Sequence, residues 1–237
     1  MAQLPESDLK HSPFVAIFGG SFNPIHLGHM RLVLEVLEAT EPKRFDLLPC
    51  ARPPHKGCRD ILPFELRVEM LRAATQGLDK VRINVMENER DGPSYTADTL
   101  QLYADREPQF RHCFIIGAED FPLIRTWFQW ERIPQLADIL VVPRAGFGHK
   151  EFDDTVHDLW PESVPMTPPC PAMDAAYALP GVANAGWLLH LPLPRLDIRS
   201  ELIRERLLAD RSVRFLVPDA VNAILLDHPE IKDTWKT

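Results

Sequence analysis

Cysteine is scarce in this sequence, and nothing in its spacing indicates pairing. The chain has four cysteines, Cys50, Cys58, Cys113 and Cys170, and none of them belongs to a C-x-x-C pair or to the dense spacing of a disulfide scaffold. This usage is typical of a protein in a reducing compartment. We therefore expect a cytoplasmic location.

Long apolar runs and an excess of basic charge are also missing. No apolar stretch is long enough to cross a membrane, and the opening MAQLPESDLKHSP lacks the apolar core of a signal peptide. The net charge is −8, from 34 acidic and 26 basic residues, which argues against an extended nucleic-acid surface. We expect neither a membrane nor a nucleic acid as partner, and any bound anion to be held by a few local basic groups.

What is present describes a globular chain with unusual proline content. With 237 residues, 45% hydrophobic and 25% charged, the chain can bury a large core, and we predict a single domain over residues 1–237. The 23 prolines are nearly twice the share of about 5% expected in an average protein. We interpret residues 1–12 as a flexible lead-in, about 146–186 as a proline-rich insertion, and about 196–228 as a C-terminal helical part.

Short apolar runs alternate with stretches of helical period along the chain. The expected strands cover residues 14–18, 45–48, 81–86, 113–116, 138–142 and 187–191. The expected helices cover residues 26–39, 64–74, 95–104, a stretch carrying Trp127 and Trp130, 199–208 and 218–226. Such alternation predicts an α/β fold with a doubly wound, mostly parallel sheet. Ligands of these sheets bind at the carboxyl ends of the strands, so the loops there should carry the site.

The most informative stretch is residues 14–29, FVAIFGGSFNPIHLGH. An apolar strand leads into Gly19 and Gly20, a turn, and the start of a helix that carries His26 and His29. Glycines let a ligand approach the backbone, and a helix start offers N–H groups with partial positive charge. The two imidazoles, three positions apart, share one helix face. We interpret the stretch as a polyanion site; the alternatives are an ordinary helix with two histidines, or a zinc site, for which a suitably spaced third ligand is lacking.

The same stretch carries a family resemblance. GGSFNPIHLGH resembles the H-x-G-H signature of the nucleotidyltransferase superfamily, and at its full length it is similar to the nicotinate-nucleotide adenylyltransferases. The resemblance runs in order from Phe14 to about Leu226, without the lead-in and the insertion. It implies a Rossmann-like nucleotidyltransferase fold and transfer of the adenylyl group of ATP to nicotinate mononucleotide, giving deamido-NAD and pyrophosphate in NAD biosynthesis. It also implies Mg²⁺ bound with ATP.

A second signature lies in LDIRSELIR, residues 196–204, which resembles the family pattern I-S-S-T-x-I-R. Ser200 can cap a helix and donate its hydroxyl to a phosphate, and Arg204 lies one turn further on the same face. Arg199 and Glu201 depart from the pattern, where the family has a serine and a threonine. Taken alone, the stretch also reads as an amphipathic helix with a solvated charged face.

The segment SYTADTL, residues 94–100, resembles a family segment that pantetheine adenylyltransferases lack. In the family its helix start meets the pyridine carboxylate, which would involve Ser94, Tyr95 and Thr96. Trp127 falls where the family has a tryptophan that stacks on the pyridine ring. The alternatives are a plain Ser/Thr helix start and a core tryptophan.

Two further matches are shorter. Gly117 and Glu119 stand where the family has G-x-D, so Glu119 replaces an aspartate, and Glu119 or Asp120 is expected at a ribose hydroxyl. Lys56 follows Pro53-Pro54-His55 where the family has a basic residue that meets the mononucleotide phosphate. A solvated lysine is the alternative, and a metal site of Cys50, His55 and Cys58 is a rival weakened by its irregular spacing.

These observations give a set of predicted site residues. The predicted catalytic residues are His26, His29, Lys56 and Arg204. The predicted ATP-binding residues are Gly19, Gly20, Ser21, Phe22, Gly28, Gly117, Glu119, Ser200 and Ile203. The predicted residues for nicotinate mononucleotide are Asn23, Lys56, Arg67, Ser94, Tyr95, Thr96 and Trp127. No protein ligand for a metal is expected.

The competing functions differ in chemistry. Nicotinamide mononucleotide as substrate is the first alternative. A nucleotide-binding module without turnover also stays open, because of the departures at Glu119 and Glu201. A class I aminoacyl-tRNA synthetase fragment would need a lysine-rich second signature, which the chain lacks. P-loop and Rossmann dinucleotide domains are excluded because GK[ST] and G-x-G-x-x-G are missing. The sequence leaves a homo-oligomer open.

Overall fold

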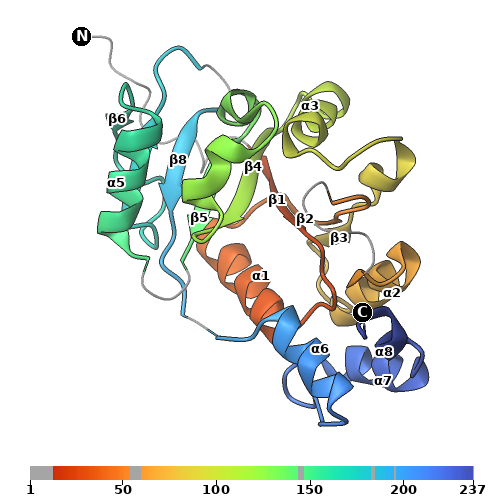
Figure 1. Cartoon of the computed structure of the whole chain (residues 1–237). Helices are drawn as coiled ribbons and strands as arrows, with labels where there is room; N and C mark the ends of the chain where they lie inside the picture. Colours follow the sequence, from red (N-terminus) through yellow and green to blue (C-terminus); the bar gives the residue numbers. More distant parts are fainter. Residues whose placement is uncertain (1–12, 54–59, 144–146, 183–184, 195, 237) are drawn as a thin grey trace. The chain divides into compact units, whose positions relative to one another are not determined.

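The structure is a computed structural model that describes residues 13–53, 60–143, 147–182, 185–194 and 196–236 (Figure 1). The predicted lead-in and the predicted ligand Lys56 lie outside the described residues. Two of the three residues of the rival metal site, His55 and Cys58, lie outside them as well. Within the described ranges, no helix has the length and apolar character needed to cross a membrane.

The described strands form one eight-stranded sheet in the order β3-β2-β1-β4-β5-β8-β7-β6. Their bounds are β1 Phe14–Gly20, β2 Arg44–Pro49, β3 Val81–Ile83, β4 Arg111–Gly117, β5 Asp138–Val142, β6 Val164–Pro165, β7 Ala175–Ala178 and β8 Trp187–His190. The pairs β1–β4, β4–β5 and β5–β8 are parallel, whereas β8–β7 and β7–β6 are antiparallel. The mostly parallel α/β sheet predicted from the sequence is confirmed.

The central strands are apolar runs because both of their faces are buried. In β5 all five residues, DILVV, are buried, and in β4 the run His112–Ile116 is buried. In register, Ile115 lies opposite Leu140 of β5, and Leu140 lies opposite Leu189 of β8. Strands covered on both faces lose the alternation of exposed and buried residues, which is why they read as continuous apolar stretches.

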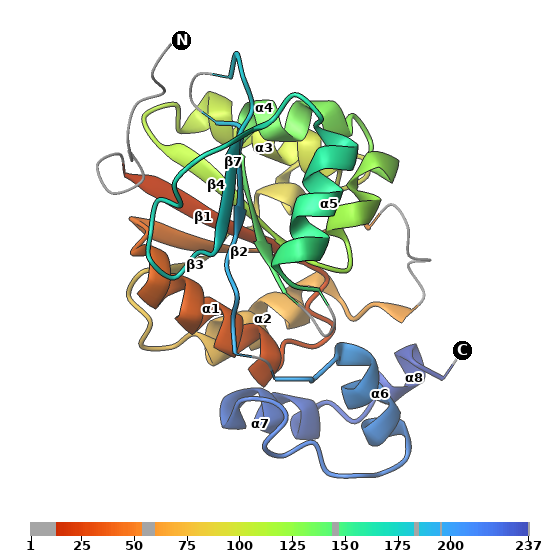
Figure 2. The ribbon, with the colours of Figure 1, turned by 90° about the vertical axis from the view of Figure 1, so that its left-hand side faces the viewer.

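Helices lie between the strands and, as α6, α7 and α8, after the last strand. Their bounds are α1 Leu27–Thr40, α2 Phe64–Ala74, α3 Thr96–Arg106, α4 Ile133–Leu136, α5 His149–Leu159, α6 Ser200–Leu208, α7 Asp219–Asp227 and α8 Ile231–Thr234. Figure 2 shows α3, α4 and α5 on the same side of β4 and β7. Where the proline-rich insertion was predicted, the structure has α5 followed by β6 and β7.

Two local predictions were wrong. The strand expected over residues 81–86 ends at Ile83, because the Asn84 side chain bonds the Asp46 carboxylate and accepts the Met86 N–H, an alternative to ladder pairing. The helical stretch expected around Trp127 is instead a pair of short 3₁₀ turns, residues 121–126 and 130–132, and Trp127 between them is extended.

The chain divides into two compact units, each made of separate segments. The first unit comprises Met1–Phe18, Leu37–Phe45 and Tyr95–Pro194, and the second comprises Gly19–Val36, Asp46–Ser94 and Arg195–Thr237. In the second unit α2 packs against α7, and α6 packs against α8. The single domain over residues 1–237 stays a prediction.

Candidate active site

The turn between β1 and α1 is shaped by close packing around its glycines. Phe22 has a φ of +44° and is buried, and its ring contacts the His29 ring edge-on with centroids 5.2 Å apart. A Cβ on Gly20 would lie 3.2 Å from the Phe22 ring. A Cβ on Gly28 would lie 3.0 Å from Nδ1 of His26. A side chain at either position would therefore have to displace a neighbouring ring by a few tenths of an ångström, so packing favours glycine here in addition to any ligand.

The two histidines predicted to act together lie side by side. The rings of His26 and His29 stack with centroids 3.7 Å apart and 24° between their planes. Nδ1 of each ring accepts the backbone N–H of the other residue, at 3.3 Å in both cases. A neutral imidazole that accepts at Nδ1 carries its proton on Nε2. This tautomer, assigned from the hydrogen bonds, presents the N–H donors that a phosphate oxygen needs.

Asn23 and Arg67 hold this turn to the segment before α2. Asn23 donates from Nδ2 to the carbonyl of Asp60 at 2.6 Å and accepts the Leu62 N–H at Oδ1 at 3.0 Å. Arg67, only 1% exposed, donates to the carbonyls of Ser21 at 2.8 Å and Leu62 at 3.0 Å. Asn23 and Arg67 were both predicted to bind nicotinate mononucleotide, and in this structure both are hydrogen-bonded to backbone groups.

Two side chains of α6 also form hydrogen bonds to the backbone of this turn. Ser200 donates from its hydroxyl to the carbonyl of Pro24 at 2.9 Å. Arg204 donates from one terminal nitrogen to the carbonyl of Asn23 at 2.9 Å, and its other terminal nitrogen lies 3.3 Å from a carboxylate oxygen of Glu201. The second signature is thus brought onto the first, with Ser200 and Arg204 bonded to its backbone.

Ser94 and Glu87 hold the segment that follows β2. The Ser94 hydroxyl accepts the N–H groups of Ala51 at 3.2 Å and Arg52 at 3.1 Å, and Glu87 accepts the Ala51 N–H at 3.3 Å. Burial raises the pKa of the neighbouring Cys50 thiol to about 11, and the charge of Glu87 adds to the rise. Our sequence analysis missed Glu87, because a glutamate within MENERD reads as a solvated residue.

The first unit holds the residues predicted for the pyridine ring. Tyr95 precedes α3 in an extended conformation and stacks on Phe128, with centroids 4.4 Å apart. Trp127 contacts Phe114 edge-on with centroids 6.2 Å apart. Thr96 is the first residue of α3, so its N–H is among those that a helix start leaves for a partner.

The remaining predicted residues can be placed by unit. Gly117 ends β4, also in the first unit, and Glu119 follows it as an exposed residue. Ile203 is fully buried in α6 of the second unit. Predicted residues that lie together in the second unit are Gly19, Gly20, Ser21, Phe22, Asn23, His26, Gly28, His29, Arg67, Ser94, Ser200, Ile203 and Arg204. Those in the first unit are Tyr95, Thr96, Gly117, Glu119 and Trp127.

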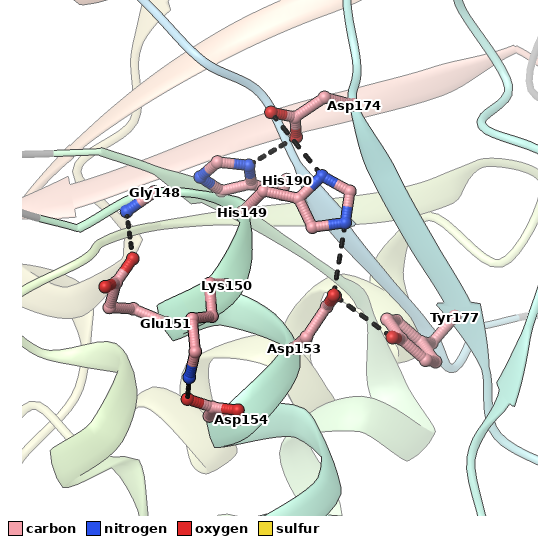
Figure 3. Close-up of polar contacts among 9 residues, drawn as sticks. All are labelled: Gly148, His149, Lys150, Glu151, Asp153, Asp154, Asp174, Tyr177 and His190. Carbon is pink, nitrogen blue, oxygen red and sulfur yellow. Dashed lines mark hydrogen bonds and ion pairs between the residues drawn. The ribbon is translucent and has the colours of Figure 1, made fainter.

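A separate polar network in the first unit was not predicted (Figure 3). His190, 1% exposed at the end of β8, lies with Nδ1 2.5 Å from Asp174, and His149 lies with Nδ1 3.9 Å from the same carboxylate. His149 also lies 3.1 Å from Asp153, which accepts the Tyr177 hydroxyl at 3.0 Å. The network ties the start of α5 to β7 and β8. Across the described part of the chain, no group of three or more His, Cys, Asp or Glu residues is arranged to hold a metal ion.

Comparison with known proteins identifies similar sequences and folds. A family model described as Cytidylyltransferase-like matches residues 17–206. A probable nicotinate-nucleotide adenylyltransferase of Marinobacter nauticus is 37% identical over 211 residues, covering 86% of this chain and 90% of that protein. One of Symbiobacterium thermophilum is 33% identical over 214 residues, covering 90% and 93%. The structure of Plasmodium falciparum nicotinic acid mononucleotide adenylyltransferase complexed with NaAD matches the fold with a TM-score of 0.69 at 15% identity, covering 92% and 97%.

Proposed function

Because this chain belongs to the nicotinate-nucleotide adenylyltransferases, within the cytidylyltransferase-like family, we infer that it transfers the adenylyl group of ATP to nicotinate mononucleotide. The products are deamido-NAD and pyrophosphate, and the reaction belongs to NAD biosynthesis. The relatives are named for nicotinate nucleotide, which supports the acid over the amide as acceptor. The Plasmodium falciparum enzyme of similar fold is complexed with NaAD, which agrees with that choice.

The observation that carries this function is the stacked histidine pair at the start of α1. With Nδ1 accepting backbone N–H groups, Nε2 is the atom on the His26 and His29 rings that can donate to an anionic ligand. The start of a helix adds partial positive charge at the same place. Donors of this kind stabilise the negative charge that develops when the α-phosphorus of ATP is attacked and pyrophosphate leaves.

The attacking group needs no activation by the protein. A phosphate monoester has its second pKa near ~6 and is anionic at pH 7. Catalysis then consists of holding the phosphate of nicotinate mononucleotide in line with the α-phosphorus of ATP and stabilising the transferred group. This explains why the turn presents nitrogen donors and no pair of nucleophile and base.

We assign the individual roles on this basis. His26, His29 and the amides of Gly19 and Gly20 hold the ATP phosphates. Arg204 acts on the pyrophosphate side through the N–H groups that remain beyond its bond to the turn. Ser200 has a single O–H, so it acts there by exchanging its bond to the Pro24 carbonyl for one to a phosphate oxygen. Lys56 orients the attacking phosphate.

The remaining assignments concern the nucleoside and pyridine groups. Gly117 and Glu119 receive the ATP ribose, and Tyr95, Thr96 and Trp127 receive the pyridine ring and its carboxylate. A cytoplasmic location and a homo-oligomer stay predictions.

Nucleotidyltransferases of this family use ATP with a divalent metal, and we propose Mg²⁺ as the ion. The turn presents imidazole and amide N–H groups, which bind phosphate oxygens, whereas Mg²⁺ prefers oxygen ligands. The residues therefore fit an ion held through ATP phosphates and water. When bound, Mg²⁺ neutralises part of the charge on the polyphosphate.

Pyrophosphate release with Mg–ATP tests the function directly. We expect turnover with nicotinate mononucleotide and a strong preference for it over the amide. Preference for the amide would show that the chain adenylylates nicotinamide mononucleotide instead. No pyrophosphate release with either substrate would favour a binding module without turnover.

A histidine variant tests the site that carries the proposal. His29→Ala should lower kcat by about 100-fold or more, the loss typical of one donor to a developing anion. His157→Ala, at an exposed position of α5, is the matched control and should leave kcat unchanged. Near wild-type turnover of His29→Ala would refute the assignment of the phosphates to this turn.

A further inference from the structure

We propose that Glu201 sets the affinity of this site for polyphosphate, because it competes with the phosphates for Arg204. The inference rests on the proposed function, in which Arg204 acts on the pyrophosphate side of ATP. It concerns a residue that departs from the family pattern, where a threonine stands.

The contacts of Arg204 divide its guanidinium into two parts. One terminal nitrogen donates to the carbonyl of Asn23 at 2.9 Å, which fixes the plane of the group against the turn. The other terminal nitrogen lies 3.3 Å from the Glu201 carboxylate. A carboxylate and a phosphate are alternative acceptors for this second nitrogen.

The exposure of the pair makes this competition possible. The Arg204 side chain is 20% exposed, whereas the Glu201 side chain is 55% exposed. A half-exposed carboxylate can swing into water when a more highly charged anion takes its place. The inner bond to Asn23 is retained in this exchange, so Arg204 stays aligned while its outer partner changes.

The position of Glu201 in α6 adds a second effect. It lies in the first turn of the helix, where N–H groups and partial positive charge attract anions. A carboxylate there stabilises the helix and repels an incoming polyphosphate. Charged residues close to it in sequence include Arg199, which lies 4.0 Å from Asp197, and Glu205 one turn further along α6.

The expected consequence is weaker binding of both polyphosphates. ATP and the product pyrophosphate meet Arg204 with the same kind of oxygen atoms, so Glu201 should weaken both. Removal of one competing charge at a partly exposed ion pair should change affinity by about 3- to 10-fold. Nicotinate mononucleotide, which binds apart from Arg204 in the proposed function, should be unaffected.

The test measures the KM for Mg–ATP and the inhibition constant of pyrophosphate in the full chain. Glu201→Gln and Glu201→Thr should lower both constants by about 3- to 10-fold, with the KM for nicotinate mononucleotide unchanged. Glu205→Gln removes the same charge one turn away and is the matched control. Unchanged or raised constants in the Glu201 variants, or an equal decrease in Glu205→Gln, would overturn the inference.

An Arg204 variant separates this inference from the proposed function. Arg204→Ala should raise the KM for Mg–ATP, and Glu201→Gln should have no further effect in that background. If Arg204→Ala leaves the KM unchanged, the role assigned to Arg204 is wrong and the inference fails with it. If Arg204→Ala raises the KM and Glu201→Gln alone changes nothing, the role of Arg204 holds and only the competition by Glu201 is refuted.

Discussion

Replacing Arg67 distinguishes a substrate ligand from a structural clamp. The sequence places Arg67 among the ligands of nicotinate mononucleotide, but in the structure it is buried and donates to the carbonyls of Ser21 and Leu62. Its guanidinium also lies over the Phe64 ring, 5.3 Å from the centroid. Arg67→Met keeps a stem of similar length and removes every donor.

The magnitude follows from the two bonds that are lost. A hydrogen bond from a charged group contributes about 1.5–3 kcal/mol, so two contribute about 3–6 kcal/mol. Burial of the guanidinium opposes this gain, and the same burial lowers the pKa of Arg67. We expect a net loss of about 2–4 kcal/mol in the free energy of unfolding. For a chain of this size, that corresponds to a decrease in Tm of roughly 5–12 °C.

Thermal unfolding and steady-state kinetics of the same preparations check the expectation. Arg67→Met should lower Tm and kcat, because the turn that carries His26 and His29 loses its support at Ser21, while the KM for nicotinate mononucleotide changes little. Arg72→Met, an exposed position in the last turn of α2, is the control. An unchanged Tm with a KM raised tenfold or more would refute the clamp and restore Arg67 as a ligand.

Three further predictions follow from packing and charge. The thiol of Cys50, with a pKa of about 11, should react with iodoacetamide at pH 8 about 100-fold more slowly in the folded protein than in urea, measured by peptide mapping; equal rates would contradict its burial. Arg111→Met should cost about 3–5 kcal/mol in the free energy of unfolding at pH 7, because it leaves the buried carboxylate of Asp138 without its bidentate partner. Burial already raises the pKa of Asp138 in the folded protein above its unfolded value. The protonated carboxyl therefore stabilises the folded state below the unfolded pKa, and this stabilisation is lost as the pH rises through the folded pKa. The decrease in the free energy of unfolding caused by Arg111→Met should therefore become smaller toward pH 4 in urea titrations. A decrease that does not depend on pH would refute the account. Gly28→Ala should lower kcat at least about 10-fold because its Cβ would lie 3.0 Å from the His26 ring; normal kcat would show that the ring moves freely.

The order of elements and the core of the site could be predicted because their causes are local. A strand buried on both faces is a continuous apolar run, so β1, β2, β4, β5 and β8 were visible in the sequence. The spacing of His26 and His29 predicted that both rings share one side of the helix start, and in the structure they stack although His26 immediately precedes α1. The glycine turn before them is likewise a property of adjacent residues.

Only the tertiary structure decided what the polar side chains bond. Arg204 meets the carbonyl of Asn23 across 181 positions of sequence, and Arg67 meets that of Ser21 across 46. No local pattern specifies such partners, because they depend on how distant elements pack. The antiparallel pairing of β6, β7 and β8 has the same origin. The sequence therefore determined which residue types gather at the turn, and the packing of distant segments decided that several of them hold its backbone.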